Sequence, residues 1–158
     1  MPRRFIHAVV VLGAHPADNR VMAEESPTQV VQRLIPLCAT LGIRVRAYRP
    51  GQVELALDWA PGLCTSGGML HGGIIMTLAD SAGGLCAFLN LPPAAQGTAT
   101  IEGKTNFLAA IRSGTATAVS RPLHVGSRTI VVETDVRADD GRLAARTLQT
   151  QAVLGGHA

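Results

Sequence analysis

The apolar residues that follow Ser26-Pro27-Thr28-Gln29 recur at the spacing of a helix. Ser26 can cap such a helix, Pro27 suits its first position, and Gln29 completes a capping box. Pro36 should kink or shorten the helix, because proline removes a backbone donor and clashes with the preceding turn. Gly42 is placed to end it. The pattern therefore predicts one helix with an interruption near residue 36.

Alternation of apolar and polar residues predicts six strands. They span about 43–49, 53–59, 98–108, 114–123, 128–138 and 142–154. Pro50-Gly51 and Asp140-Gly141 mark two of the turns between them. The short spacing predicts a largely antiparallel sheet. No repeat, linker or second domain is visible, so residues 26–158 are expected to form a single domain after an N-terminal extension, residues 1–25.

A glycine-rich segment beginning at Thr65 leads into about twenty residues, up to Asn90, that read as one helix. This helix is apolar on nearly every side, which predicts burial on nearly every side. Asp80 is its only formally charged residue. A carboxylate in such a place must be paired, hydrogen-bonded or protonated, because an unpaired buried charge is very costly.

These elements define an α+β fold in which a twisted antiparallel sheet lies against a long central apolar helix. Because one sheet covers only one side of a helix, we expect wrapping strands or a partner subunit to cover the rest.

The start of the long helix can itself bind a ligand through its backbone. Its first backbone N–H groups have no acceptor within the helix, and the helix dipole favours negative charge there. Glycine at 72 and 73 would let a ligand carbonyl approach closely. Each feature also has a plainer interpretation: His71 as a capping loop residue, the glycines as turn residues, and Asp80 as a structural acid.

Composition narrows the function classes. Hydrophobic residues make up 47% of the chain and charged residues 16%, as in a globular protein, and the net charge is +3. No basic run with interleaved aromatics is present, so no nucleic-acid partner is expected, whereas a mildly positive field suits a polyanion. Three cysteines without metal spacing favour reduced thiols, no bound metal and a cytoplasmic location.

No apolar run reaches the length of a membrane span, so no membrane association is expected. Residues 1–25 faintly imitate a signal peptide, but the apolar stretch is short and lacks a clean cleavage site. An accessory strand, or an extension ahead of a start at Met22, is the better interpretation.

Taken together, the motifs resemble a known family. His71-Gly72-Gly73 followed seven residues later by Asp80, inside a long apolar helix, is similar to the PaaI-like group of hot-dog-fold thioesterases, which hydrolyse acyl-coenzyme A. Thr100-Ile101-Glu102-Gly103-Lys104-Thr105-Asn106-Phe107-Leu108 is similar to the first strand after the family's helix. Gly126-Ser127-Arg128 and Gly141-Arg142-Leu143-Ala144 fall at its later hairpins. The resemblance covers residues 27–154 and implies a hot-dog fold, with the sheet wrapped around the helix.

The resemblance also implies roles for the residues. The backbone N–H of Gly72, with Gly73 beside it, would hold the thioester oxygen next to His71. Asp80 would activate water or attack the carbonyl directly. Thr100 matches a hydroxyl position that assists the water in some relatives. Strict alternation places Thr98, Thr100, Glu102, Lys104 and Asn106 on one polar face of their strand, which could equally be a solvent-exposed edge.

One position departs from the family pattern. Relatives usually have Asn six residues before the His, and this chain has Thr65, which puts ligand or water orientation there in doubt. Thr65, His71 and Gly73 are the candidate substrate-binding residues at the helix start. Arg121 and Arg128 are candidates for coenzyme A phosphates, since the arginine fork matches phosphate geometry.

The expected activity is therefore acyl- or aryl-coenzyme A hydrolysis, with no cofactor other than the coenzyme A of the substrate. A non-catalytic acyl-coenzyme A-binding protein is the alternative. A hydratase of this fold would need a catalytic histidine paired with an acid, and His71-Gly72-Gly73 is not that motif. A DNA-binding regulator would need a helix-turn-helix domain, for which residues 1–25 are too few. The family forms homodimers at least, and a homotetramer is expected here. Helix geometry predicts a site shared between subunits, because seven residues separate Gly73 from Asp80 by about 10 Å.

Overall fold

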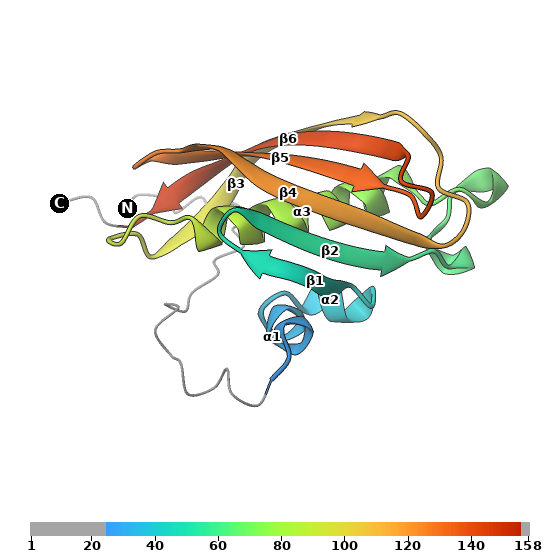
Figure 1. The fold of residues 1–158 in the computed structure, drawn as a ribbon, viewed down its shortest axis with the longest axis horizontal. Helices are drawn as coiled ribbons and strands as arrows, with labels where there is room; N and C mark the ends of the chain where they lie inside the picture. Colours follow the sequence, from blue (N-terminus) through green and yellow to red (C-terminus); the bar gives the residue numbers. More distant parts are fainter. Residues whose placement is uncertain (1–24, 156–158) are drawn as a thin grey trace, which may run out of the picture.

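Six antiparallel strands form one sheet in the order β1-β2-β4-β5-β6-β3 (Figure 1). The computed structural model describes residues 25–155. The strands are β1 Arg44–Arg49, β2 Gln52–Asp58, β3 Gly97–Phe107, β4 Thr115–Val125, β5 Thr129–Arg137 and β6 Leu143–Leu154. All six predicted strands are present, within a few residues of their predicted bounds. The extension predicted over residues 1–25 lies outside the described residues, apart from Glu25.

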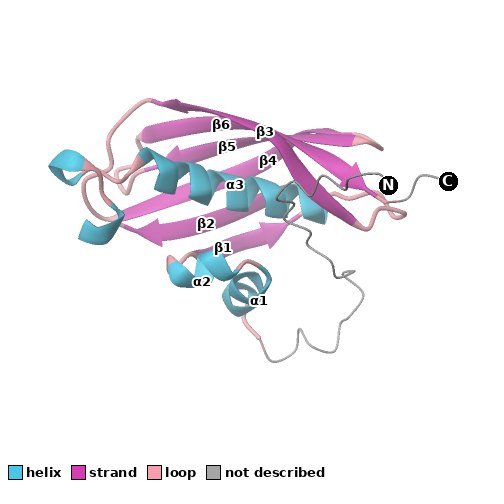
Figure 2. Ribbon diagram, turned by 180° about the vertical axis from the view of Figure 1, so that it is seen from behind, coloured by secondary structure: helices cyan, strands magenta, loops and turns pink. Residues whose placement is uncertain are grey.

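The predicted first helix is two short helices, α1 (Pro27–Leu34) and α2 (Pro36–Thr40). Ser26 caps α1 as expected, and the capping box with Gln29 is complete. The interruption falls at Ile35, because a residue before proline is pushed out of the helical region. Gly42, with φ 68°, follows at the end of α2. The two helices lie beside β1 at one edge of the sheet (Figure 2).

The long helix α3 (Gly72–Leu89) crosses one face of the sheet (Figure 2). Its buried flank includes Leu78, Ala82 and Leu85. Its other flank is open in the single chain, where Met76 and Asp80 are exposed. The expectation of burial on nearly every side is therefore wrong for one chain, because a single sheet covers only one side. By length and composition alone α3 could also cross a membrane, contrary to the sequence prediction, but here it packs as a core helix.

The face of the sheet that meets α3 changes character from one half to the other. On β2 and β4 the side chains of this face are mainly apolar, and those that are buried include Val53, Leu55, Leu57, Ala116 and Ala118. Toward β6 and β3 it is polar, and the buried side chains there include Thr98, Thr147, Gln149 and Gln151. We call these parts the apolar half and the polar half. β5 lies between them and contributes both Val132 and Thr134.

A β-bulge at Ile101 sets which side chains of β3 face α3. Thr100 pairs with Gln151, but Glu102 pairs with Thr150, so one extra residue lies between them. Glu102, Lys104 and Asn106 therefore lie on the opposite face from Thr98 and Thr100. The predicted continuous polar face is wrong beyond residue 100, because strict alternation cannot anticipate a bulge. In their place Gly103, Thr105 and Phe107 face α3.

Candidate active site

The loop before α3 is fixed by hydrogen bonds from three directions. The indole N–H of Trp59 donates to the Gly68 carbonyl at 3.0 Å, and Arg112 donates to the Gly67 carbonyl at 2.6 Å. The His71 N–H donates to the Leu63 carbonyl at 2.9 Å. Gly67 and Gly68 have φ values of 75° and 70°, a region that side chains disfavour. The helix start is therefore held by a rigid turn.

Only one of the first backbone donors of α3 lacks an acceptor among residues 25–155. The Gly73 N–H donates to Nδ1 of His71 at 2.8 Å, and Ile74 and Ile75 donate to the His71 carbonyl. The Gly72 N–H has no such partner. His71 is thus the helix cap, as its plainer interpretation held. Since its Nδ1 accepts a hydrogen bond, the neutral imidazole carries its proton on Nε2.

Gly72 also has a packing reason to be glycine. A Cβ added there would lie 3.2 Å from the ring of Phe107 on β3. The aromatic ring therefore closes one side of the helix start.

Asp80 lies in the middle of α3, above the polar half of the sheet. Its Oδ1 accepts a hydrogen bond from the Thr100 hydroxyl at 3.1 Å and another from the Gln149 amide. Its Oδ2 has no hydrogen-bond partner among the described residues. Of the three states that the sequence left open for this carboxylate, the structure shows the hydrogen-bonded one, although the side chain is exposed in the single chain rather than buried.

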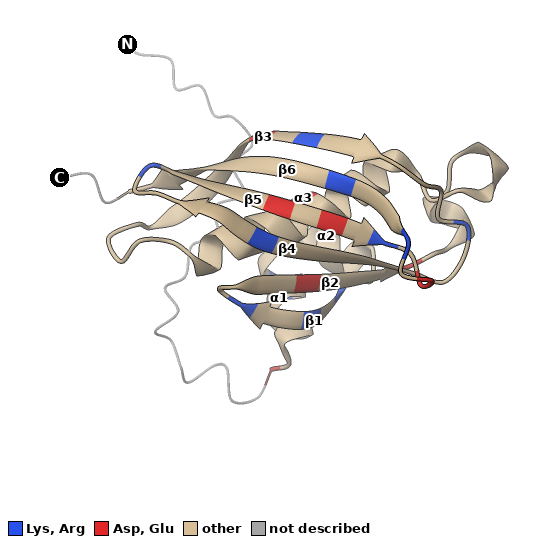
Figure 3. Cartoon of the chain, turned by 45° about the horizontal axis from the view of Figure 1, so that its top comes forward, with Lys and Arg blue, Asp and Glu red and all other residues tan. Residues whose placement is uncertain are grey.

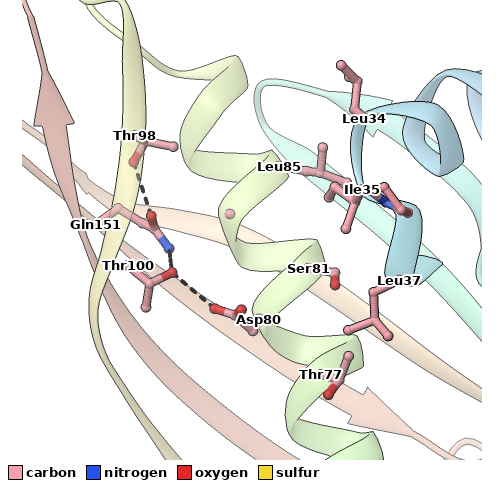
Figure 4. Close-up of a pocket in the computed structure, with 12 residues that line it drawn as sticks. Leu34, Ile35, Leu37, Thr77, Asp80, Ser81, Leu85, Thr98, Thr100 and Gln151 are labelled. Carbon is pink, nitrogen blue, oxygen red and sulfur yellow. Dashed lines mark hydrogen bonds between the residues drawn. The ribbon is translucent and has the colours of Figure 1, made fainter. Parts of the chain in front are cut away.

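Three hollows lie along the flank of α3 that carries Asp80. One, of about 280 Å³, has Asp80, Thr100 and Gln151 at one end and the apolar side chains of Leu34, Ile35, Leu37 and Leu85 at the other (Figure 4). A second, of about 360 Å³, lies between α3 and β3 and is lined by Met76, Thr105 and Thr147 among others. A third, of about 410 Å³, lies at the helix start beside Cys64 and His71. Thr77 lines all three, so they follow one flank of the helix.

The helix start and Asp80 are far apart within one chain. Eight residues separate Gly72 from Asp80, which corresponds to about 12 Å along a helix. That distance exceeds hydrogen-bond reach several-fold. The structure thus brings Asp80 and Thr100 together, and it brings His71, Gly72 and Gly73 together, as two separate groups.

The remaining predicted substrate-binding residues belong to neither group. Thr65 lines none of the three hollows. Arg121 lies on the outer face of the sheet, where it donates to Gln52 at 3.1 Å. Arg128 is in the turn between β4 and β5. Contact of either arginine with coenzyme A phosphates remains a prediction, and within one chain Arg121 faces away from Asp80.

The outer face of the sheet carries charges of both signs (Figure 3). Arg146 and Arg137 donate to Asp135, and these hydrogen bonds hold the pKa of that carboxyl below its usual range. Arg146 also forms an ion pair with Glu133 at 3.5 Å. These charges satisfy one another, so the outer face has the character of a solvated surface.

Sequence reasoning missed two glutamines that complete the surroundings of Asp80. Gln149 and Gln151 both lie on β6, and both donate to the Thr100 hydroxyl, at 3.1 and 2.8 Å. The alternation of β6 gives the reverse signal, since Leu148 faces outward and is 44% exposed while its polar neighbours are buried. The three cysteines are free thiols, and burial raises the pKa of Cys86 to about 11. In the described part of the chain, no group of three or more His, Cys, Asp or Glu side chains is placed to hold a metal ion.

Comparison with known proteins places the chain in a family and a fold. Residues 67–145 match the thioesterase superfamily. The crystal structure of a thioesterase family protein from Silicibacter pomeroyi is 31% identical, with a TM-score of 0.75 over 82% of this chain and 96% of that one. The Escherichia coli 1,4-dihydroxy-2-naphthoyl-CoA hydrolase is 33% identical over 87 residues, which are 55% of this chain and 63% of the hydrolase. The E. coli PaaI protein shares the fold, with a TM-score of 0.74 at 19% identity over 81% of this chain and 91% of that one.

The architecture is thus the hot-dog fold that the sequence predicts. The chain belongs to the thioesterase superfamily, and among its structural neighbours is the PaaI protein.

Proposed function

We propose that this protein is an acyl-coenzyme A thioesterase, which hydrolyses an acyl- or aryl-coenzyme A to the free acid and coenzyme A. The observation that carries the proposal is the pair of groups along one flank of α3: the free N–H of Gly72, and the hydrogen-bonded carboxylate of Asp80. Thioester hydrolysis needs a polarised carbonyl and an activated nucleophile, and these groups supply one each.

The chemistry follows from the two groups. The Gly72 N–H donates to the thioester oxygen, where negative charge develops at the positive end of the helix dipole. Asp80 takes a proton from water through Oδ2, the water oxygen bonds to the carbonyl carbon, and the carbon–sulfur bond breaks. The departing coenzyme A thiolate then takes that proton from Asp80, which returns the carboxylate to its starting state. In the other role left open by the sequence, Oδ2 attacks the carbon itself and water then hydrolyses the acyl anhydride. Label in Asp80 after single-turnover hydrolysis in H₂¹⁸O would establish direct attack, with water opening the anhydride at the Asp80 carboxyl carbon, because water activation never labels Asp80.

The site is proposed to form between two subunits. The two groups are about 12 Å apart in one chain, whereas two α3 helices packed antiparallel about a twofold axis bring each start near the middle of the other. The flank that would be covered exposes apolar side chains beside Asp80: Met76 on α3 is 43% exposed, and Phe107 on the edge strand β3 is 52% exposed. We propose a homodimer at least, with a homotetramer as the larger assembly.

Complementation tests the shared site. Gly72→Pro removes the free N–H at a first-turn position that suits proline, and the preceding residue, His71, has the extended backbone that proline requires (φ −63°, ψ 136°). Because the proline Cβ would lie close to the Phe107 ring, the folding of this variant and of Asp80→Ala is confirmed first. Mixed with Asp80→Ala by unfolding and refolding, Gly72→Pro should give half the dimers as heterodimers, each with one intact site. About a quarter of parental activity should return. A mixture that stays inactive, while mass spectrometry shows heterodimers, would place the site within one chain.

The hollow beside Leu34, Ile35, Leu37 and Leu85 is proposed to take the acyl group. Its volume of about 280 Å³ compares with the ~150 Å³ of an apolar cavity that binds benzene. A substituted ring or a chain of moderate length fits that space, and a long fatty acyl chain does not. The aryl-coenzyme A named for the E. coli hydrolase falls in the first class.

A thiol-release assay over short-chain, medium-chain, long-chain and aromatic acyl-coenzyme A esters tests the function directly. Turnover of aromatic and medium-chain esters, lost in Asp80→Asn, is the expected result. Tight binding of the same esters without hydrolysis would instead support the acyl-coenzyme A-binding alternative.

A further inference from the structure

Gln149 contacts the reactive carboxylate from beneath the helix. It lies on β6, faces α3 and is only 1% exposed. Its amide nitrogen donates to Oδ1 of Asp80 and, at 3.1 Å, to the Thr100 hydroxyl. It is therefore the one side chain of the sheet's polar half that touches both members of the Asp80 group.

The amide of Gln149 can face Asp80 in only one way. The opposite orientation would place its carbonyl oxygen against a carboxylate, and two acceptors repel each other. In the orientation found, that carbonyl oxygen is buried and has no hydrogen-bond partner within residues 25–155. A buried acceptor without a partner lowers stability. Gln149 thus donates a hydrogen bond to Asp80 while its own carbonyl oxygen stays without one. A residue retained only for packing would not be expected to adopt this arrangement.

Gly83 makes room for this side chain. A Cβ at residue 83 would overlap the carbonyl oxygen of Gln149, whereas a Cβ at the neighbouring Gly84 would meet nothing within 4 Å. The contact of α3 with the Gln149 side chain therefore depends on glycine at 83 and not at 84.

The Thr100 hydroxyl has no hydrogen-bonding capacity left for water. It donates its single proton to Asp80, and its oxygen accepts from both Gln149 and Gln151. A hydroxyl has one donor and two acceptor positions, so all three are filled. Thr100 is therefore placed to act on Asp80 and not on the attacking water that its sequence match suggests.

We infer that Gln149, admitted by Gly83, is a positioning residue that fixes Oδ1 of Asp80 so that Oδ2 is presented to the substrate. This inference rests on the proposed thioesterase function for its effect on turnover. The hydrogen bonds that define it exist without substrate.

Asp80 is held by uncharged donors alone. The hollows on either side of it are lined by residues of α1, α2, α3, β3 and β6, and among those residues no other side chain is titratable. A carboxyl group introduced at 149 would therefore be the first like charge beside Asp80, and like charges at hydrogen-bond distance disfavour double ionisation.

Two substitutions test the role with opposite chemistry. Gln149→Met keeps the shape and removes the donor, and it should lower kcat at least tenfold with KM changed less than threefold. Gln149→Glu keeps the size and adds a carboxyl group, and it should move the acidic limb of the kcat/KM profile upward by at least one pH unit. The matched control is Ser120→Ala/Thr134→Val, which removes another buried polar pair, joined at 2.6 Å, from the same face of the sheet. It should leave both quantities within twofold of the parent.

A titration without substrate separates this inference from the proposed function. The carboxyl carbon of Asp80, labelled with ¹³C and assigned by its loss in Asp80→Asn, is followed by NMR in the parent, both Gln149 variants and Gly83→Ala. We expect the titration midpoint to move in Gln149→Glu and Gln149→Met and, because the glutamine is displaced, in Gly83→Ala. If the midpoints of the variants differ from that of the parent, but the parent hydrolyses no thioester, the proposed function is refuted and the positioning role of Gln149 stands. Unchanged midpoints and unchanged turnover in Gln149→Met, which removes no packing volume, would overturn the inference even if Gln149→Glu fails to fold.

Discussion

The two halves of the sheet under α3 differ in what their buried residues do. In the apolar half Val53, Leu55 and Leu57 pack against the helix and make no hydrogen bonds with their side chains. In the polar half Gln149 and Gln151 are buried just as deeply, yet their side chains form a network that ends at Asp80. One helix thus has a flank that stabilises it and a flank that carries chemistry. Substitutions in the first half should therefore change stability, and substitutions in the second should change turnover.

The largest expected effect is a loss of stability from a substitution in the apolar half, with turnover unchanged. Leu55→Ala, at a fully buried position, should lower the free energy of unfolding by about 2–5 kcal/mol, because burial is lost and a cavity remains. The kcat of the molecules that stay folded should not change. Urea unfolding and active-site-normalised kinetics at low temperature measure the two quantities. Leu148→Ala on the outer face is the control, with an expected loss within about 0.5–1 kcal/mol. A large fall in the kcat of folded Leu55→Ala would mean that the halves are not separable.

The converse substitution is Asp80→Asn. It removes the activating carboxylate while keeping its shape, so turnover should fall at least about a hundredfold, equivalent to ~2.7 kcal/mol. The thermal midpoint should move by only a few degrees, since Asp80 is exposed in the chain. Steady-state thioester hydrolysis and calorimetry check both parts. Parental turnover in the variant would show that Asp80 is structural.

Thr100 offers a smaller and more selective change. Thr100→Val removes the hydroxyl that donates to Asp80 at 3.1 Å and should lower kcat about tenfold, the scale of one hydrogen bond to a charged group. Thr100→Ser retains the hydroxyl and should stay within about threefold of the parent. If Thr100→Val keeps parental activity while Thr100→Ser loses it, packing of the methyl group matters and the hydrogen bond does not.

The smallest expected effect concerns an ion pair at the surface edge of the apolar half. Both nitrogens of the Arg44 fork donate to Asp58 at 2.7 Å, and these bonds, with that from Thr115, lower the pKa of Asp58 to about 2. A carboxyl whose pKa is lower in the folded state stabilises at pH well above 4, and this contribution is lost as pH falls from about 4 toward 2.

Because the Asp58 side chain is 57% exposed, solvent screening limits the contribution to less than about 1 kcal/mol. Asp58→Asn should thus lower the free energy of unfolding slightly at pH 7 and by less at pH 2.5, where much of the contribution is already lost. Chemical unfolding at the two pH values measures this difference. An equal loss at both would contradict the charge-based explanation.

The sequence predicts the apolar half better than the polar half, for a physical reason. Val53, Leu55 and Leu57 alternate in the sequence with Glu54, Ala56 and Asp58, and such alternation is what half-buried strands produce, although Ala56 is itself buried. Pro36, Gly42 and Ser26 signal helix ends by local backbone chemistry, which needs no tertiary information. The elements of the fold were therefore predictable nearly to their bounds.

The site was predictable only where it depends on local chemistry. His71, Gly72 and Asp80 stand out because a glycine-rich helix start and a lone acid are unusual in an apolar segment. Gln149 does not stand out, because a buried glutamine and an exposed one look alike in sequence. Its role depends on contact with α3, sixty-nine residues away along the chain. The engagement of the Gly73 N–H by His71 likewise depends on a side-chain rotamer that no spacing specifies.

The bulge at Ile101 also bears on how this strand can change length over evolution. Thr100 pairs with Gln151 and Glu102 with Thr150, so a chain lacking residue 101 would join two segments already in regular register. Loss of that residue alone would leave Thr100 and Gly103 on their present side of the sheet. Loss of any other residue after Thr100 in β3 would exchange the two faces, unless the bulge were resorbed. A one-residue gap in an alignment of this strand therefore belongs at position 101, whatever amino acids flank it.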